Sequence, residues 1–452
     1  MGHTHAPARR NFLKLSARLA ALGLTGVGLG PSRSFFVAEA SAAPNVTDYK
    51  ALVCVYMFGG NDSNNTIVPV DTARYTAYQS LRSGLSLTGS KLLSPIPDAN
   101  GNPYALHYGL AEMNPLYASG HLAIVLNMGQ LNRPLTRAEY LAGASAPSNL
   151  FSHSDQTTQA QTGTSQQVAS GWGGRLLDLF GASDTLAAVS VSSPAIFLQG
   201  EDVRSNVIPP GANLALSGMN FWPPAAADAR RQAVNAMVLM DGGNPIREAA
   251  NRAFADGLQL GDTLQLNGSL PPLSAVFPGT SLGNQLKEVA RLIRVRSQMG
   301  PGRQVFFCSI GGFDTHSGQD YTHWNLLQQL SQALFAFASA TFELGVADRV
   351  TTFTQSEFNR TMQSNGSGSD HAWGAHQFVL GGAVRGGIYG MMPTFAFSGP
   401  DDANNRGVWI PTIAAAQFGA TLGRWFGATP GELEWAFPNL SNFSIKDVGF
   451  MR

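Results

Sequence analysis

The chain has few charged residues and few cysteines for its length. Only 13% of its 452 residues are charged, and 29 basic residues balance 29 acidic ones, so the formal net charge is zero. This balance argues against a nucleic-acid partner, because a nucleic-acid-binding protein carries a basic surplus. The 44% of apolar residues excludes a disordered chain and is sufficient for a large core. The sequence therefore indicates a folded protein with many glycine-containing loops.

The two cysteines, Cys54 and Cys308, both lie in apolar runs. Two residues so far apart form no cysteine metal motif. They are expected to be buried free thiols or, if their strands are neighbours in an oxidising compartment, to form a disulfide. The sequence leaves both alternatives open.

The N-terminal segment has the three parts of an export signal. Arg9 and Arg10 begin a basic stretch, an apolar run covers 15–29, and small residues follow at 40–42. The twin arginines followed by Phe-Leu-Lys predict a twin-arginine signal over 1–42, with an ordinary secretion signal or a membrane anchor as the alternative. We therefore expect a periplasmic or secreted protein that uses the twin-arginine export machinery. No later segment is apolar for long enough to predict a permanent membrane span.

Short apolar runs alternate with helix-period stretches along the rest of the chain. The runs cover 51–58, 121–126, 304–310 and 349–354, and the helical stretches cover 109–119, 229–256, 282–299 and 324–344. This alternation predicts an α/β fold, a three-layer sandwich with a mostly parallel central sheet. We expect 43–452 to form one domain with an irregular insert near 193–224 and an amphipathic helix over 410–427.

Acidic and imidazole side chains gather in the loops that follow the apolar runs, where open α/β sheets bind ligands. Asp314 and His316 are two residues apart, so both point the same way in an extended segment. Carboxylate and imidazole together suit a divalent ion, and we predict one or two ions of zinc, manganese, magnesium or calcium. The alternative is a set of capped turns and core histidines. The candidate ligands are Asp62, Asp314, His316, Glu357, Asp370, His371 and His376.

Two further segments are candidates for catalytic roles. Ser152 and Ser154 flank His153, and a hydroxyl near a divalent ion can become a nucleophile because the metal lowers its pKa. A polar turn that caps a helix explains the same residues. Arg360 has the planar fork that clamps anionic groups, with a buried ion pair to Glu357 as the alternative.

These segments together resemble an exported family known as domain of unknown function 1501. The resemblance rests on Gly59-Gly60-Asn61-Asp62, the 152–156 and 356–358 segments, Gly311-Gly312-Phe313-Asp314-Thr315-His316, and Asp370-His371 followed by Ala-Trp-Gly. That family is similar to the alkaline phosphatase and sulfatase superfamily, which implies an alkaline-phosphatase-like α/β sandwich with two metals at strand ends.

The resemblance also implies roles for single residues. Asp62 resembles the first-strand aspartate that binds one metal, and the pair Asp370 and His371 resembles an Asp-His pair at the same or a shared metal position. Asp314, with His316 as companion, resembles the aspartate of the other metal site. His376 resembles the late histidine of the superfamily. The sequence has no clear counterpart of the superfamily nucleophile.

The expected function is therefore an exported metal-dependent hydrolase of phosphate or sulfate esters, acting on a small anionic or carbohydrate-linked substrate. The alternative is a metal-containing binding or assembly protein of the same fold without catalysis, which the missing nucleophile favours. A serine hydrolase that uses Ser154 and His153 ranks lowest, because adjacent residues rarely meet in the geometry of a triad and no nucleophile elbow is present.

Overall fold

The computed structural model describes residues 48–182, 184–212, 214, 216–219, 221–240, 244–266, 270–296 and 302–452. The predicted export signal at 1–42 lies outside the described residues and stays a prediction. Within the described part, none of the helices combines the length and the hydrophobicity that crossing a membrane requires.

A nine-stranded sheet forms the centre of the described structure. Its order is β13, β5, β12, β9, β1, β8, β6 and β7, and β14 also pairs with β5. Only β12 runs antiparallel to its neighbours β5 and β9, so the prediction of a mostly parallel sheet is confirmed. The strands are β1 (Lys50–Met57), β5 (Leu122–Gly129), β6 (Ala188–Ser190), β7 (Asn206–Val207), β8 (Arg303–Ile310), β9 (Val350–Gln355), β12 (Ala375–Leu380), β13 (Gly387–Tyr389) and β14 (Ile413–Ala414).

Alternate residues of the central strand β1 face two separate cores. Val53 and Val55 belong to one hydrophobic cluster, whereas Leu52 and Tyr56 belong to the other. Successive side chains of a strand point to opposite faces, so a strand covered on both sides is apolar throughout. This is why the apolar runs of the sequence lack a polar alternation.

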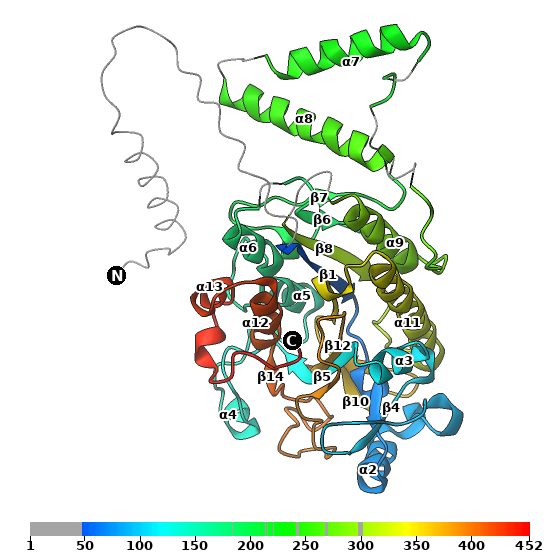
Figure 1. Ribbon diagram of the computed structural model, residues 1–452. Coiled ribbons are helices and arrows are strands. Elements are labelled where there is room, and N and C mark those ends of the chain that lie inside the picture. Colours follow the sequence, from blue (N-terminus) through cyan, green and yellow to red (C-terminus); the bar gives the residue numbers. More distant parts are fainter. Residues whose placement is uncertain are drawn as a thin grey trace, which may run out of the picture.

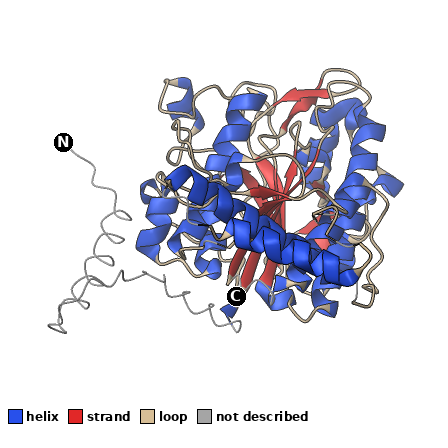
Figure 2. Ribbon diagram, turned by 90° about the horizontal axis from the view of Figure 1, so that it is seen from above, coloured by secondary structure: helices blue, strands red, loops and turns tan. Residues whose placement is uncertain are grey.

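Helices cover both faces of the sheet, which gives the predicted three layers (Figure 2). The first core is covered by α3 (Met113–Ala118), α9 (Ser281–Arg294) and α11 (Gln319–Glu343). The second is covered by α5 (His153–Thr162), α6 (Trp172–Leu179), α12 (Ala415–Phe426) and α13 (Pro430–Ala436). The predicted helix over 410–427 begins only at Ala415, because 413–414 pair with β5 as β14.

The predicted helix over 229–256 is instead two helices, α7 (Pro224–Val238) and α8 (Pro245–Leu266). Pro245 explains the break, since proline is tolerated in the first turn of a helix but not in its interior. The two helices project together from the body of the molecule (Figure 1). They follow the segment predicted as an insert near 193–224, whose described residues before Pro224 form a 3-10 turn, Ile196–Leu198, and β7 as their regular elements.

Smaller elements lie around the end of the sheet where β1 terminates. A three-stranded sheet has the order β2, β4, β3, and β10 pairs antiparallel with β11. The helix α2 (Thr72–Arg82) contacts β2 and β10, and the helix α4 (Arg137–Leu141) packs against the second core through Tyr140. The strands are β2 (Ile67–Pro69), β3 (Ile96–Pro97), β4 (Pro103–Leu106), β10 (Arg360–Ser364) and β11 (Ser369–His371).

The two cysteines are buried free thiols although their strands are neighbours. In the parallel register Cys308 lies beside Val55, one position beyond Cys54, so the two side chains belong to different cores on opposite faces. A disulfide cannot form across the sheet in this register.

We therefore predict that a thiol reagent labels neither cysteine in the native protein and both cysteines after denaturation, with or without prior reduction. The measurement is the mass of the protein after alkylation under the four conditions. Labelling that requires a reductant would show a disulfide and contradict this register.

Candidate metal centre

The candidate site lies where loops leave the carboxyl ends of three neighbouring strands. Gly59 follows β1, Asp314 follows β8 and Glu357 follows β9. The start of α5 supplies His153, and the end of β11 supplies His371. The carboxyl ends of parallel strands meet at one edge of a sheet, so residues more than 200 positions apart become neighbours there.

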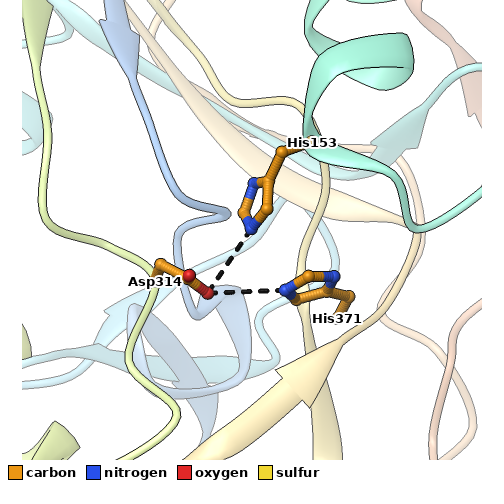
Figure 3. A group of neighbouring side chains, drawn as sticks. All are labelled: His153, Asp314 and His371. Atoms are coloured by element: carbon orange, nitrogen blue, oxygen red, sulfur yellow. Dashed lines mark ion pairs between the residues drawn. The ribbon is translucent and has the colours of Figure 1, made fainter.

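One carboxylate oxygen, Oδ1 of Asp314, lies at the centre of the site. Figure 3 shows His153 and His371 pointing at this carboxylate from two sides. The Nε2 atoms of both histidines are 3.4 Å from its Oδ1 atom. The Nε2 atom of His316 is 3.1 Å from the same oxygen and 3.0 Å from Nε2 of His371. One ligand atom from each of His153, Asp314 and His371 lies within 4.8 Å of the others.

The far side of each imidazole ring is held by an oxygen atom. Nδ1 of His153 is 2.8 Å from Oε1 of Glu357, and Nδ1 of His316 is 3.2 Å from Oδ1 of Asp370. Nδ1 of His371 is 2.8 Å from the carbonyl oxygen of Phe151. An ionised carboxylate and a carbonyl can only accept, so each Nδ1 carries a proton and donates it. When the ring is neutral, the other nitrogen, Nε2, is unprotonated, and its lone pair points toward Asp314 in all three histidines.

The carbonyl that holds His371 comes from a strained residue. Phe151 has a φ of +72°, a left-handed conformation that is unusual for a bulky side chain. Such strain persists only where the surrounding structure fixes it, and it is common at functional sites. The next residue, Ser152, begins α5 as its N-cap, so the same turn positions His153.

Arg360 supplies a positive charge directly behind Asp314. Its side chain is fully buried, and its guanidinium contacts Asp314 and donates to the carbonyl oxygens of Gly59, Gly60 and Ser369. Burial alone would raise the pKa of Asp314, but the hydrogen bond and charge of Arg360, with smaller effects from the histidines, lower it to about 2. Asp314 is therefore an anion at any physiological pH, and Arg360 does not form the alternative ion pair with Glu357.

The acidic partners give the histidines different proton affinities. The hydrogen bond that His153 donates to Glu357 raises the pKa of His153, whereas burial lowers the pKa of His371. The hydrogen bond from Arg406 is the largest effect on Asp370; burial opposes it, but with the further hydrogen bonds from Asn365 and His316 the pKa of Asp370 is lowered to about 2. Glu357 and Asp370 thus orient His153 and His316 from behind and do not face Asp314 themselves. Asp370 contacts His316, Asn365 and Arg406, and Glu357 contacts His153 and the backbone N–H of Gly59.

Glycines are required where two of these loops touch. A Cβ atom on Gly59, whose φ is +113°, would lie 2.3 Å from the backbone nitrogen of Asp314. A Cβ on Gly368 would lie 2.3 Å from the carbonyl carbon of His316. Both distances are impossible for a real side chain, so these glycines let the backbone of the neighbouring loops bring Asp314 and His316 into place.

Ser152 and Ser154 lie at the start of α5 and hydrogen-bond locally. The hydroxyl of Ser152 contacts the carboxylate and the backbone N–H of Asp155, which is the geometry of an N-cap. The Ser154 hydroxyl lies 3.2 Å from that of Ser152 and 3.4 Å from the Asp155 carboxylate. Ser154 nevertheless lines a hollow of about 400 Å³ with His153 and Asp314, together with Phe58, Gly59, Thr157 and Glu357. This hollow gives the site an opening to solvent.

Two predicted ligands lie apart from this group. Asp62 is fully buried, and its carboxylate accepts from Arg82 and from Gln319. His376 is buried in β12, accepts from the backbone N–H of Asn127 at 2.9 Å, and burial lowers its pKa to about 4. The structure thus brings Asp314, His316, His371 and His153 together, places Glu357 and Asp370 behind them, and leaves Asp62 and His376 in other contacts.

Three groups that hold the predicted ligands in place were not themselves predicted from the sequence. Arg406 holds Asp370 from a loop without a distinctive pattern, and Arg82 neutralises Asp62 from the end of α2. The carbonyl of Phe151 is a backbone group, which no side-chain motif can reveal. The basic residue in the last turn of α2 was the only available signal, and it also fits an ordinary helix end.

The fold and the site define an α/β protein with a histidine and aspartate cluster at the carboxyl edge of a mostly parallel sheet. A sequence profile described as "Protein of unknown function (DUF1501)" matches residues 49–407. The chain belongs to this family, as its motifs indicated. No curated protein matches the chain.

Two solved structures match the chain weakly and have little sequence in common with it. The crystal structure of Ps i-CgsB in complex with k-i-k-neocarrahexaose is 10% identical, with a TM-score of 0.36 over 84% of this chain and 72% of that one. A candidate sulfatase from Bacteroides thetaiotaomicron is 10% identical, with a TM-score of 0.29 over 86% of this chain and 75% of that one. Similarity of this degree assigns no substrate to the present chain.

The pairing of Asp62 with Arg82 predicts a structural role for both. Neither side chain is exposed, so replacing Arg82 by methionine leaves a buried carboxylate without its cation. We expect Arg82→Met to lower the free energy of unfolding by about 3–5 kcal/mol, measured by urea denaturation.

The matched control is Arg424→Met, which removes an arginine that is 68% exposed and paired with Asp447. An exposed pair contributes at most about 1 kcal/mol. A loss at Arg82 as small as at Arg424 would show that the buried pair does not hold this part of the structure.

Proposed function

We propose that His153, His316, His371 and Asp314 bind a divalent metal ion. The observation that carries the proposal is the convergence of three Nε2 lone pairs on one carboxylate, with each Nδ1 fixed by an acceptor. Groups that only accept repel one another unless a cation lies between them. An oxygen atom that holds the far nitrogen of a ligating histidine is also the usual arrangement around protein metal ions.

Two further features fit an ion at this position. Nε2 of His153 is buried and has no hydrogen-bond partner among the described residues. The two Nε2 atoms of His316 and His371 are 3.0 Å apart, close to the roughly 3.3 Å between two nitrogen ligands of one tetrahedral zinc ion. Three nitrogens and one oxygen favour zinc or another transition metal over magnesium or calcium, which prefer oxygen ligands.

We further propose that the protein is an exported hydrolase of phosphate or sulfate esters. A divalent ion in the cluster would stabilise negative charge on an ester oxygen. The hollow beside His153 offers room for a small anionic group, and the first turn of α5 contributes His153 and Ser154 to its lining. Arg360 keeps Asp314 ionised, and Ser154 and Thr157 both line the hollow and carry hydroxyl groups. A carbohydrate-linked ester and export by the twin-arginine machinery are parts of the same proposal.

The alternative is a binding or assembly protein that holds the ion without catalysis. The local hydrogen bonds of Ser152 and Ser154 favour it, because both hydroxyls contact the Asp155 carboxylate and neither contacts Asp314. A nucleophile from this segment would have to exchange these contacts for the substrate.

We predict that the purified protein binds about one equivalent of zinc or a similar ion, and that Asp314→Ala and His371→Ala each reduce its affinity at least tenfold. The measurement is metal content after dialysis, with circular dichroism to check folding. His121→Ala is the control, since the imidazole of His121 contacts Ser119 and Phe342, which are not part of the histidine cluster. Equal metal content in all variants would contradict the proposed ligands.

The metal affinity should also fall with pH in a defined window. Protons compete with the metal ion for Nε2. The metal affinity is therefore highest above the pKa values of the histidines and falls as the pH drops through them. The pKa of an ordinary histidine is about 6.5. His153 has a raised pKa and begins to lose its lone pair first, while Asp314, with a pKa of about 2, stays ionised. An affinity that is constant from pH 8 to pH 5 would exclude the histidines as ligands.

Catalysis is tested separately with a panel of aryl phosphates and aryl sulfates. We expect metal-dependent turnover that Asp314→Ala abolishes, and that Ser154→Ala lowers by at least a hundredfold if the serine is the nucleophile. Thr158→Ala is the matched control, because its hydroxyl only caps the backbone of α5. Metal binding without turnover of any ester would support the non-catalytic alternative.

A further inference from the structure

The projecting helix α8 carries one continuous stripe of apolar and small residues. Its positions are spaced alternately by four and three residues, which is the pattern of a seam between packed helices. They are Ile246, Ala250, Ala253, Gly257, Leu260 and Leu264. Leu260 and Leu264 are buried against the body, with 5% and 3% exposure, whereas Ile246 is 80% exposed. The same stripe is thus covered at one end and open at the other.

The neighbouring helix α7 does not cover the open part. Ala250, Ala253 and Gly257 are exposed, whereas Asn251 and Ala255, on another face of α8, are partly buried. The side chain of Asn251 donates to the carbonyl of Met240, so α7 and its end pack on that other face. Among the described residues of α7 only Ala227 is buried. Helices of this length are only marginally stable in water unless one face is buried. Because most of both helices is exposed, we expect a partner to cover the open stripe.

Large apolar side chains are concentrated at the outer end of this helical pair. Met237 is 66% exposed, Leu239 83% and Met240 58%, and Ile246 is close to them in the chain. Together with the open stripe they form a projecting apolar surface. Exposed apolar surfaces of this kind generally mark interaction sites.

The inner end of α8 borders a hollow of about 960 Å³. Ala253, Gly257 and Leu260 of the stripe line it, opposite apolar side chains that include Phe180 and Trp435. A helix about 10 Å across occupies on the order of 400 Å³ per turn, so the hollow has room for about two turns. Its carboxylates come from Asp178, Asp184, Glu201, Asp202, Asp256 and Glu432, against one arginine, Arg204.

We propose that the protein is a dimer in which the α8 helices of two copies pack antiparallel through this stripe. A twofold axis between positions 251 and 252 brings Ile246 of one copy opposite Gly257 of the other, and Ala250 opposite Ala253. The stripe is therefore complementary to itself, as a twofold interface requires. The outer half of each α8 fills the hollow at the base of the other.

The charges select a second copy over an anionic lipid surface. The outer half of α8 carries Arg247 and Arg252 against one acidic residue, Glu248, and the hollow that receives it is lined mainly by carboxylates. Over 221–262 the sequence has four arginines and five acidic residues, so the helical pair lacks the basic surplus that attracts anionic lipids. Gly257 has open space around its Cα, which leaves room for the partner's Ile246.

The test is a cysteine cross-link in the full chain. The double variant Ile246→Cys with Gly257→Cys should form a disulfide-linked dimer on oxidation, because the two residues meet across the twofold axis. Within one helix they are about 16 Å apart and cannot bond to each other. The native Cys54 and Cys308 are fully buried and contribute no background.

Single variants and sedimentation equilibrium complete the test. Ile246→Cys alone should not cross-link, since its two copies would also lie about 16 Å apart. The unmodified chain should sediment at twice the mass of one chain, and Ile246→Glu at the mass of one. Leu141→Glu, which changes an equally apolar side chain that is 57% exposed on α4, should remain dimeric. A monomeric unmodified chain, no cross-link in the double variant, or a cross-link in the single variant would overturn the proposal.

Discussion

The arrangement of the site depends on the buried charge of Arg360. A guanidinium without solvent needs an anion and several acceptors, and here Asp314 and three backbone carbonyls provide them. Those carbonyls belong to the loops after β1 and at the start of β11, and Asp314 belongs to the loop after β8. The guanidinium of Arg360 therefore holds three segments of the chain together. The Asp314 carboxylate that it contacts is the group on which the histidines converge.

A second set of contacts fixes the direction of each imidazole ring. Glu357, Asp370 and the carbonyl of Phe151 each accept a hydrogen bond from one Nδ1–H group, so the rings cannot turn away from Asp314 without losing a hydrogen bond. Preorganisation of this kind separates a metal or ligand site from a chance group of histidines. The positive φ of Phe151 shows that the backbone accepts strain in order to present that carbonyl.

The proposed metal site and the proposed dimer interface lie in different parts of the molecule. The cluster lies at the carboxyl ends of the strands, whereas the hollow beside α8 is lined by residues that precede β6, such as Ala182 and Thr185. A dimer formed through α8 would therefore leave the histidine cluster open to solvent. The loops at the end of the sheet hold the histidine cluster, and the projecting helices carry the exposed apolar stripe.

The sequence alone determined the fold class, the positions of the main strands and the residues that gather at their ends. Each apolar run could be read locally, because burial on both faces leaves no polar alternation. The tertiary structure decided which of the candidates meet. Asp62 and Asp314 both follow buried strands, yet Arg82 from α2 neutralises the first, and three histidines surround the second. Likewise, Cys54 and Cys308 lie on adjacent strands, and only a register offset of one residue puts them on opposite faces. Contacts between distant segments depend on register and on loop geometry, and neither is encoded in the local pattern of a single stretch of chain.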